Sequence, residues 1–102
     1  MKIMSIYLAL VAGMISIPLA AHEELGRKEL HRLVMQGEIL PLEEILKRYP
    51  EEQYGKLLDL EVEREEGGRV EYELEFLNAD GRVREIKVDA SSGTLLVQEI
   101  EN

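Results

Sequence analysis

Carboxylates at alternate positions are the residues of this sequence with the clearest chemical potential. Between residues 58 and 76, acidic side chains alternate with aliphatic and aromatic ones. A period of two predicts strands of an antiparallel sheet that has one buried face and one solvated face. The carboxylates predicted to share the solvated face, and to form a partner-binding surface there, are Asp59, Glu61, Glu63, Glu71, Glu73, Glu75 and Glu85.

Two interpretations of this acidic surface are open. The first is a solvated face that is kept charged for solubility and to deter aggregation at the sheet edges. The second is that a cationic partner, such as a basic segment of another protein, covers it. Like charges that face each other weaken a sheet by a few tenths to about 1 kcal/mol per pair, so a partner would explain why they are tolerated.

Metal binding is the alternative function that the sequence suggests. The surface carboxylates could hold a divalent cation weakly, although no segment has the ligand spacing of a calcium loop. His22 and His31 are the only histidines. If processing leaves His22 as the first residue, its amine and imidazole would suit copper. A straight helix does not place His22 and His31 on one face, and a frayed polar terminus is the other interpretation of His22. No cofactor is predicted.

Catalysis has weaker support. The hydroxyl groups of Ser91, Ser92 and Thr94 lie in or beside a predicted turn whose composition already explains them. A triad of one of them with His31 would need a spatial arrangement for which the sequence gives no sign. Carboxylates on a flat strand face also lack the cleft that would separate their pKa values for acid and base roles. We therefore predict that the protein is not an enzyme and has no catalytic residues.

The composition limits which folds, sites and binding partners the protein can have. The chain has 102 residues, a formal net charge of −9 and 45% hydrophobic residues, which suits one small folded domain. The absence of cysteine excludes disulfides and thiolate metal sites. An acidic chain is also a poor partner for nucleic acid, whose phosphates bind clusters of Lys and Arg.

The first residues have the pattern of a secretory signal peptide, predicted at 1–21. Met1 and Lys2 form a short positive start, residues 3–17 are apolar, and residues 18–21 resemble a processing site. A membrane anchor is the alternative, but the apolar run is shorter than the roughly 18 to 20 residues that a spanning helix needs. We expect a periplasmic or secreted protein that has no membrane segment after cleavage.

The spacing of apolar residues predicts two helices, followed by four strands. Helices are expected over residues 23–36, ending at Gly37, and over residues 42–49, between Pro41 and Pro50. Strands are expected at residues 56–65, 69–77, 82–88 and 94–100, separated by glycine-bearing turns. The predicted fold is α+β, with two N-terminal helices packed on one face of a four-stranded antiparallel sheet. Residues 22–38 form an additional helix, and residues 39–102 form the main domain.

Loop length and side-chain parity predict the strand registers. A three-residue loop at 66–68 puts Val62 opposite Tyr72, and by the same parity it places the pairs Leu60 with Leu74 and Leu58 with Phe76. The loop at 79–81 pairs Leu74 with Ile86, so both hairpins agree on one apolar face. Two registers of the last strand remain open. One buries Leu96 and Ile100, whereas the other buries Leu95 and Val97 and puts Arg84 opposite Glu99.

Three segments together resemble the bacterial PepSY domain family. They are residues 40–46 in the second helix, 70–76 in the tyrosine-bearing strand and 89–95 in an Asp-Ala-x-x-Gly turn, within a similar stretch at 39–97. The family's turn commonly has threonine where this chain has Ser92. The resemblance implies an exported, noncatalytic module, because PepSY domains occur in propeptides of secreted metallopeptidases and in small envelope proteins. It suggests as partner an envelope or secreted protein, such as a peptidase or a sensor domain with a basic surface, and it provides no catalytic residues.

Overall fold

The structure is a computed structural model that describes residues 22–101. The predicted signal peptide at 1–21 lies outside these residues. Within them, no helix has the length and apolar character needed to cross a membrane.

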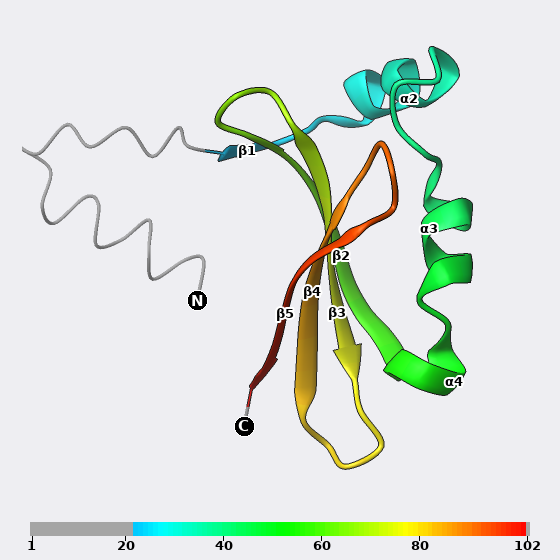
Figure 1. The fold of residues 1–102 in the computed structure, drawn as a ribbon, viewed down its shortest axis with the longest axis vertical. Coiled ribbons are helices and arrows are strands. Elements are labelled where there is room, and N and C mark those ends of the chain that lie inside the picture. Colours follow the sequence, from blue (N-terminus) through cyan, green and yellow to red (C-terminus); the bar gives the residue numbers. More distant parts are fainter. Residues whose placement is uncertain (1–21, 102) are drawn as a thin grey trace, which may run out of the picture.

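One antiparallel sheet of five strands forms the body of the domain, and its strands follow chain order from β1 to β5 (Figure 1). The strands are β1 (His22–Glu24), β2 (Lys56–Glu65), β3 (Val70–Leu77), β4 (Val83–Asp89) and β5 (Leu95–Glu101). The four predicted strands are therefore present. The strand β1 was not predicted, because three residues are too few to show a period of two.

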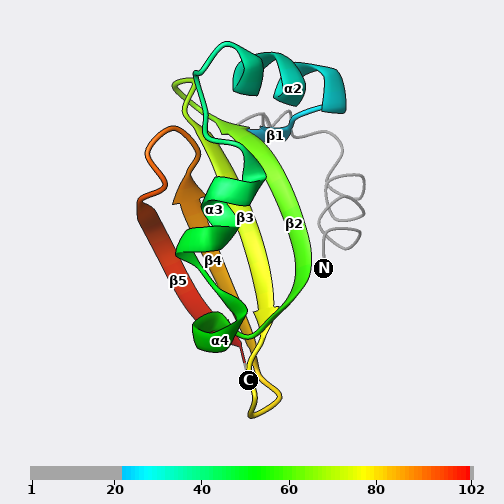
Figure 2. The same ribbon diagram turned by 90° about the vertical axis from the view of Figure 1, so that its right-hand side faces the viewer.

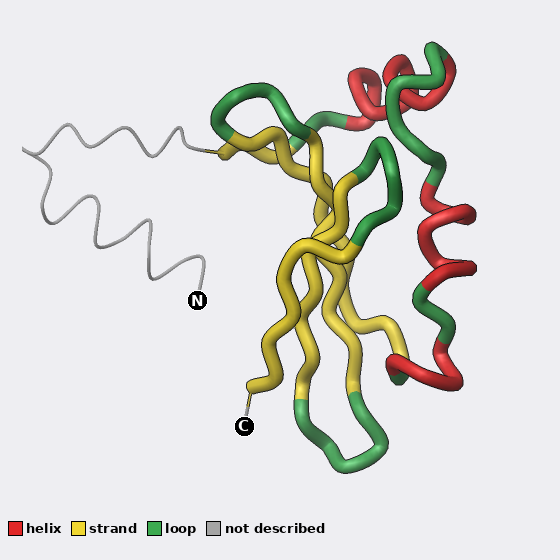
Figure 3. Tube along the Cα trace, viewed as in Figure 1, coloured by secondary structure: helices red, strands yellow, loops and turns green. Residues whose placement is uncertain are grey.

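Three helices lie on one side of this sheet (Figure 3). They are α2 (Arg27–Met35), α3 (Leu42–Arg48) and α4 (Glu51–Tyr54). Figure 2 shows α3 crossing the sheet face, with α2 and α4 near its two ends. The α+β class is confirmed, but the described residues form three helices and five strands where two helices and four strands were predicted. The first helix also begins at Arg27, because residues 22–24 pair with β2 instead.

The registers of the two predicted hairpins are largely confirmed. Val62 faces Tyr72, and Leu74 faces Ile86. One pair was wrong, because Leu57 rather than Leu58 lies opposite Phe76. The cause is a β-bulge between Leu57 and Asp59, which inserts one unpaired residue into β2. Beyond the bulge the parity is restored, so the acidic residues keep their predicted side.

The last strand adopts neither predicted arrangement in full. Arg84 faces Ile100, and Glu85 faces Glu99. A second irregularity, between Lys87 and Val88, shifts the register at the start of β5. Every residue of β5 is exposed, so the strand buries none of the side chains that either register assigned to the core.

The hydrophobic core lies between the sheet and the helices. Its fully buried large side chains are Tyr72, Phe76, Ile45, Leu74, Ile86 and Val88. All but Ile45 come from the inner face of β3 and β4, and Ile45 comes from α3. Burial of this apolar face is the principal driving force for the fold, at roughly 25 cal/mol per Å² of apolar surface removed from water.

Two tyrosine hydroxyls fix the segment around α3 to the sheet and to its last turn. The hydroxyl of Tyr72 donates to the carbonyl oxygen of Leu40 at 2.7 Å, and the hydroxyl of Tyr49 donates to that of Gly93 at 2.7 Å. Burial raises the pKa of Tyr72, so this hydroxyl keeps its proton at neutral pH. The helices of residues 22–101 all lie on the inner side of the sheet, and none of them covers its opposite face (Figures 1 and 3).

Candidate functional site: the acidic face

The strand registers place all seven predicted carboxylates on the side of the sheet opposite the helices. Pairing adds Glu24 opposite Glu63, Asp89 opposite Glu71, and Glu99 opposite Glu85. Glu101, which faces Val83, lies on the same side. We call this surface the acidic face, and its residues are Glu24, Asp59, Glu61, Glu63, Glu71, Glu73, Glu75, Glu85, Asp89, Glu99 and Glu101.

Sequence reasoning missed the four outermost members of this set, namely Glu24, Asp89, Glu99 and Glu101. Glu24 was assigned to a helix, and the side of Glu99 depended on a register that the sequence left open. For Asp89 the signal was present, because the hairpin parity that pairs Tyr72 with Val88 also pairs Glu71 with Asp89. The acidic face is therefore larger than predicted and reaches both edges of the sheet.

Facing positions on this surface carry like charges. Glu61 faces Glu73, and the next row runs from Asp59 through Glu75 and Glu85 to Glu99. Each such pair costs a few tenths to about 1 kcal/mol when both members are ionised. Lys87 faces Glu73 and offsets part of the charge in its row.

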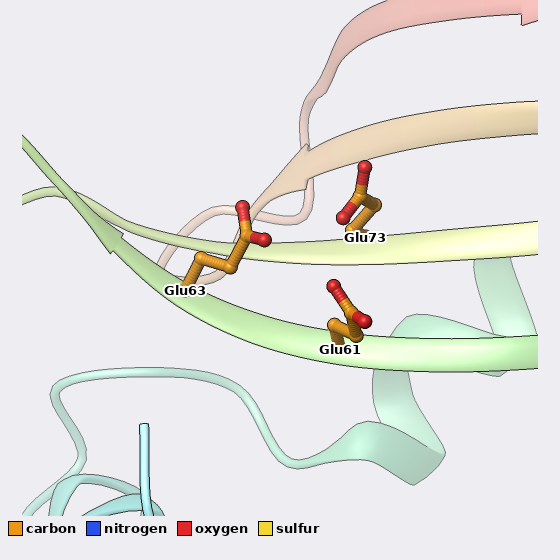
Figure 4. Close-up of side chains that lie close together, drawn as sticks. All are labelled: Glu61, Glu63 and Glu73. Carbon is orange, nitrogen blue, oxygen red and sulfur yellow. The ribbon is translucent and has the colours of Figure 1, made fainter. Parts of the chain in front are cut away.

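Three carboxylates converge at the centre of the acidic face. Glu61 and Glu63 come from β2 and Glu73 from β3, and each offers an oxygen within 4.8 Å of the others (Figure 4). Carboxylate oxygens are the ligands that Ca²⁺ and Mg²⁺ prefer. Calcium takes six to eight oxygens, so water would have to supply much of the coordination of any ion held here. This cluster is the one place among residues 22–101 where three or more ligand-type side chains meet.

The histidines do not belong to this cluster. His31 is exposed on α2, on the helical side of the sheet, and the side chain of His22 lies outside what the structure describes. The copper site suggested by the sequence therefore finds no described partner in His31.

Two carboxylates of the acidic face are withdrawn from water. Glu63 is 6% exposed and Glu71 is 5% exposed. Arg69 compensates Glu71 with a charge-assisted pair, in which its Nη2 and Nε lie 2.8 and 2.9 Å from Glu71 Oε2. Burial of an acidic side chain costs free energy and contributes nothing to solubility, so these two residues do not fit a purely solubilising surface.

Among the carboxyl groups of the acidic face, Glu85 has the most strongly shifted pKa. Desolvation, a hydrogen bond with Glu73, and the charges of Glu73, Glu75 and Glu101 raise the pKa of Glu85 to about 7. Glu85 therefore keeps its proton up to about neutral pH, and this proton supports its hydrogen bond with Glu73.

Replacing Glu85 with glutamine is expected to stabilise the protein at pH 8 and to change little at pH 4.5. In the unfolded chain the group ionises near 4.5, whereas in the folded protein it ionises near 7. The native state thus binds more protons between these values, and its stability falls as the pH rises through this window. With allowance for solvent screening, the gain at pH 8 is about 1 to 2 kcal/mol. Urea unfolding at both pH values measures it.

The matched control for this variant is Glu66→Gln in the exposed turn between β2 and β3. It removes one acid without touching the acidic face, so its effect should stay within about 0.5 kcal/mol at either pH. Equal effects of the two substitutions at pH 8, or a gain for Glu85→Gln that persists at pH 4.5, would contradict the raised pKa of Glu85.

The candidate hydroxyl nucleophiles serve the turn between β4 and β5. Asp89 accepts hydrogen bonds from the hydroxyl and the backbone N–H of Ser91, at 2.7 and 2.8 Å. The Ser91 hydroxyl is the main cause of the lowered pKa of Asp89. The hydroxyl of Ser92 bonds to that of Thr94 at 2.9 Å. These contacts organise a turn, as the sequence predicted.

A hollow of about 390 Å³ lies beneath α4, beside the turn between β3 and β4 and the end of β5. Its charged lining residues are Glu51, Glu52, Asp80, Arg82 and Arg84. The lining contains no histidine, serine or threonine, so it offers no hydroxyl nucleophile beside an imidazole base.

Comparison with protein families identifies the domain. The model of the PepSY family, described as the peptidase propeptide and YPEB domain, matches residues 39–99. The chain belongs to the PepSY family. The match covers α3, α4 and most of the sheet, including nearly all of the acidic face. Searches of the curated proteins and of the solved structures found no match to this chain.

The PepSY match gives the fold a functional context. The name of the family links it to peptidase propeptides, which is consistent with a noncatalytic, regulatory role. It assigns no catalytic residues, and the organised turn at Asp89 lies within the matched region. In this PepSY protein, α2 and β1 precede the matched residues and pack at one end of the sheet (Figure 2).

Proposed function

We propose that this PepSY protein is an exported, noncatalytic module that binds and modulates a second envelope or secreted protein through its acidic face. The partner is a protein with a basic surface, of which a peptidase or the extracytoplasmic part of a sensor are the classes that the family suggests. The observation that carries the proposal is the set of carboxylates on one side of the sheet, which includes residues of all five strands and places most of them opposite one another.

Burial within this set favours binding over solubility alone. A solubilising surface needs exposed charges, yet Glu63 and Glu71 are almost fully buried and Glu85 is desolvated enough to retain a proton. Charges already withdrawn from water lose less hydration when a partner covers them. Their field would also steer a basic partner and speed its association.

The test is capture of partners from an envelope extract by wild type and by the double variant Glu61→Lys/Glu75→Lys. Each new lysine faces remaining acids, Glu73 in the first case and Glu85 in the second, so the fold should be retained or gain stability. We expect the double variant to lose the basic partners that wild type retains. Thermal unfolding of both proteins verifies that the variant is folded.

The matched control is Glu38→Lys/Glu52→Lys, which makes the same change in net charge at exposed positions on the helical side. This control should capture the same partners as wild type at about 0.1 M salt, where screening limits long-range effects. If both double variants behave alike, net charge rather than the acidic face governs binding, and the proposal fails.

A further inference from the structure

The last strand of the sheet is open along its outer side. Among the residues that the structure describes, strand β5 pairs with β4 only, and it stands at the end of the strand order, as Figure 2 shows. Its seven residues are all exposed. An edge strand of this kind presents unpaired backbone N–H and C=O groups, which can pair with an added strand.

Natural sheets protect such edges with lysine, proline, bulges or very short strands. The opposite edge has these devices: β1 is three residues long, and β2 has a bulge between Leu57 and Asp59 beside Lys56. In contrast, β5 contains neither lysine nor proline, and its pairing with β4 is regular from Val97 to Glu101. Its exposed aliphatic residues are Leu95, Leu96, Val97 and Ile100, at 37% to 44% exposure.

The two sides of β5 differ in chemistry. Glu99 and Glu101 point to the acidic face, where Glu99 lies opposite Glu85. Ile100 lies on the other side, opposite Arg84, and lines the hollow under α4. A strand added along β5 would therefore meet the carboxylates of Glu99 and Glu101 on one side. On the other side it would meet Ile100 beside the amide of Gln98.

We propose that β5 receives an extended segment of the partner as a sixth strand, whose residues alternate between basic and aliphatic. This inference rests on the proposed function and specifies how the partner is recognised. Backbone hydrogen bonds provide affinity, and the charged residues at alternate positions provide specificity. The basic residues lie beside Glu99 and Glu101, and the aliphatic ones extend the surface around Ile100. A second copy of this chain is a poor occupant, because its own Glu99 and Glu101 would face the same carboxylates.

The experiment uses a synthetic peptide of alternating lysine and valine, about the length of β5, with NMR of the labelled protein. We expect the β5 amides to shift on titration, and alternate ones to gain protection from hydrogen exchange as an added strand pairs with them. Binding should weaken at high salt. The variant Glu99→Lys/Glu101→Lys should bind about tenfold more weakly. The control Glu38→Lys/Glu43→Lys, at exposed positions outside the hollow beside Ile100, should bind within about twofold of wild type.

Several results would overturn strand addition at β5. One is the absence of peptide binding; another is binding whose shifts centre on β2 and β3 without new protection in β5. A concentration-dependent dimer that pairs β5 with itself, and that the peptide does not disrupt, would assign the edge to a second copy. A peptide with the same residues but its lysines in one block should lose the β5 protection, and retained protection would show that alternation plays no part.

The outcomes also separate this inference from the proposed function. If the peptide docks on β5 but Glu61→Lys/Glu75→Lys captures its partners normally, the edge site stands and the wider acidic face is not required. If capture depends on Glu61 and Glu75 while β5 gains no protection, the acidic face stands and strand addition is wrong.

Discussion

Replacing Gly55 with alanine is expected to destabilise the folded protein by about 3 kcal/mol. Gly55 joins α4 to β2 with φ +104° and ψ −172°, a conformation that is essentially restricted to glycine. An added Cβ would also overlap the backbone carbonyl of Leu77. Because backbone atoms cannot move aside as a flexible side chain can, the strain must be relieved by displacing β2 from β3.

Gly81→Ala is the matched control for this substitution. Gly81 also has a positive φ, of +87°, but an added Cβ there meets no atom within 4 Å. It should cost only the backbone term, about 1 to 2 kcal/mol. Thermal unfolding compares the two variants, and a loss of about 3 kcal/mol lowers the midpoint by at least about 12 °C in a domain of this size. Equal losses would mean that the close approach to Leu77 has no effect on stability.

Leu74→Ala is expected to cost about 3 kcal/mol through lost burial and the cavity it leaves. Leu74 is 0% exposed at the centre of the inner face, between Leu60 on β2 and Ile86 on β4. The substitution tests which face of the sheet is buried, because the same change on a solvated face would be nearly silent. Urea unfolding gives the free energy directly.

The control for Leu74 is Leu96→Ala on the open strand β5. Leu96 is 39% exposed and belongs to the irregular start of the strand, so its loss should stay below about 1 kcal/mol. If Leu96→Ala costs as much as Leu74→Ala, the edge is packed rather than open, and strand addition at β5 loses its basis.

The core of the fold could be predicted from the sequence because alternation and loop length leave little freedom. A hairpin with a short loop fixes which side chains face each other, so the pairs Val62 with Tyr72 and Leu74 with Ile86 follow from counting residues. The agreement between two independent hairpins identified one apolar face. That face is the one covered by α3 in the structure (Figure 2).

The differences between the predicted and the observed fold have causes that counting residues does not detect. A bulge adds one residue to a strand and leaves no mark in the residue pattern. For this reason Leu57, and not the predicted Leu58, lies opposite Phe76. The strand β1 exists only because β2 offers an edge beside residues 22–24, a tertiary effect. The helix α4 forms in a segment whose polar composition predicted a loop. Pro50 is its N-cap, and the carbonyl oxygen of Pro50 accepts hydrogen bonds from the N–H groups of Gln53 and Tyr54.

The central members of the acidic face were predictable, but its outer members and its energetics were not. Parity placed Glu61, Glu73 and Glu75 correctly, whereas the burial of Glu71 and the raised pKa of Glu85 depend on three-dimensional neighbours. The hydrogen bond between Glu85 and Glu73 joins residues at diagonal positions on neighbouring strands, so no local pattern reveals it.

Zero-length carbodiimide cross-linking of a captured complex tests the central claim most directly, because it joins carboxylates to lysines that touch them. The account predicts that partner lysines become linked to Glu61, Glu73, Glu75 and Glu99, which are all on the acidic face. Links confined to Glu43, Glu51 and Glu52 on the helical side would contradict it, since the partner would then sit on the opposite surface of the domain.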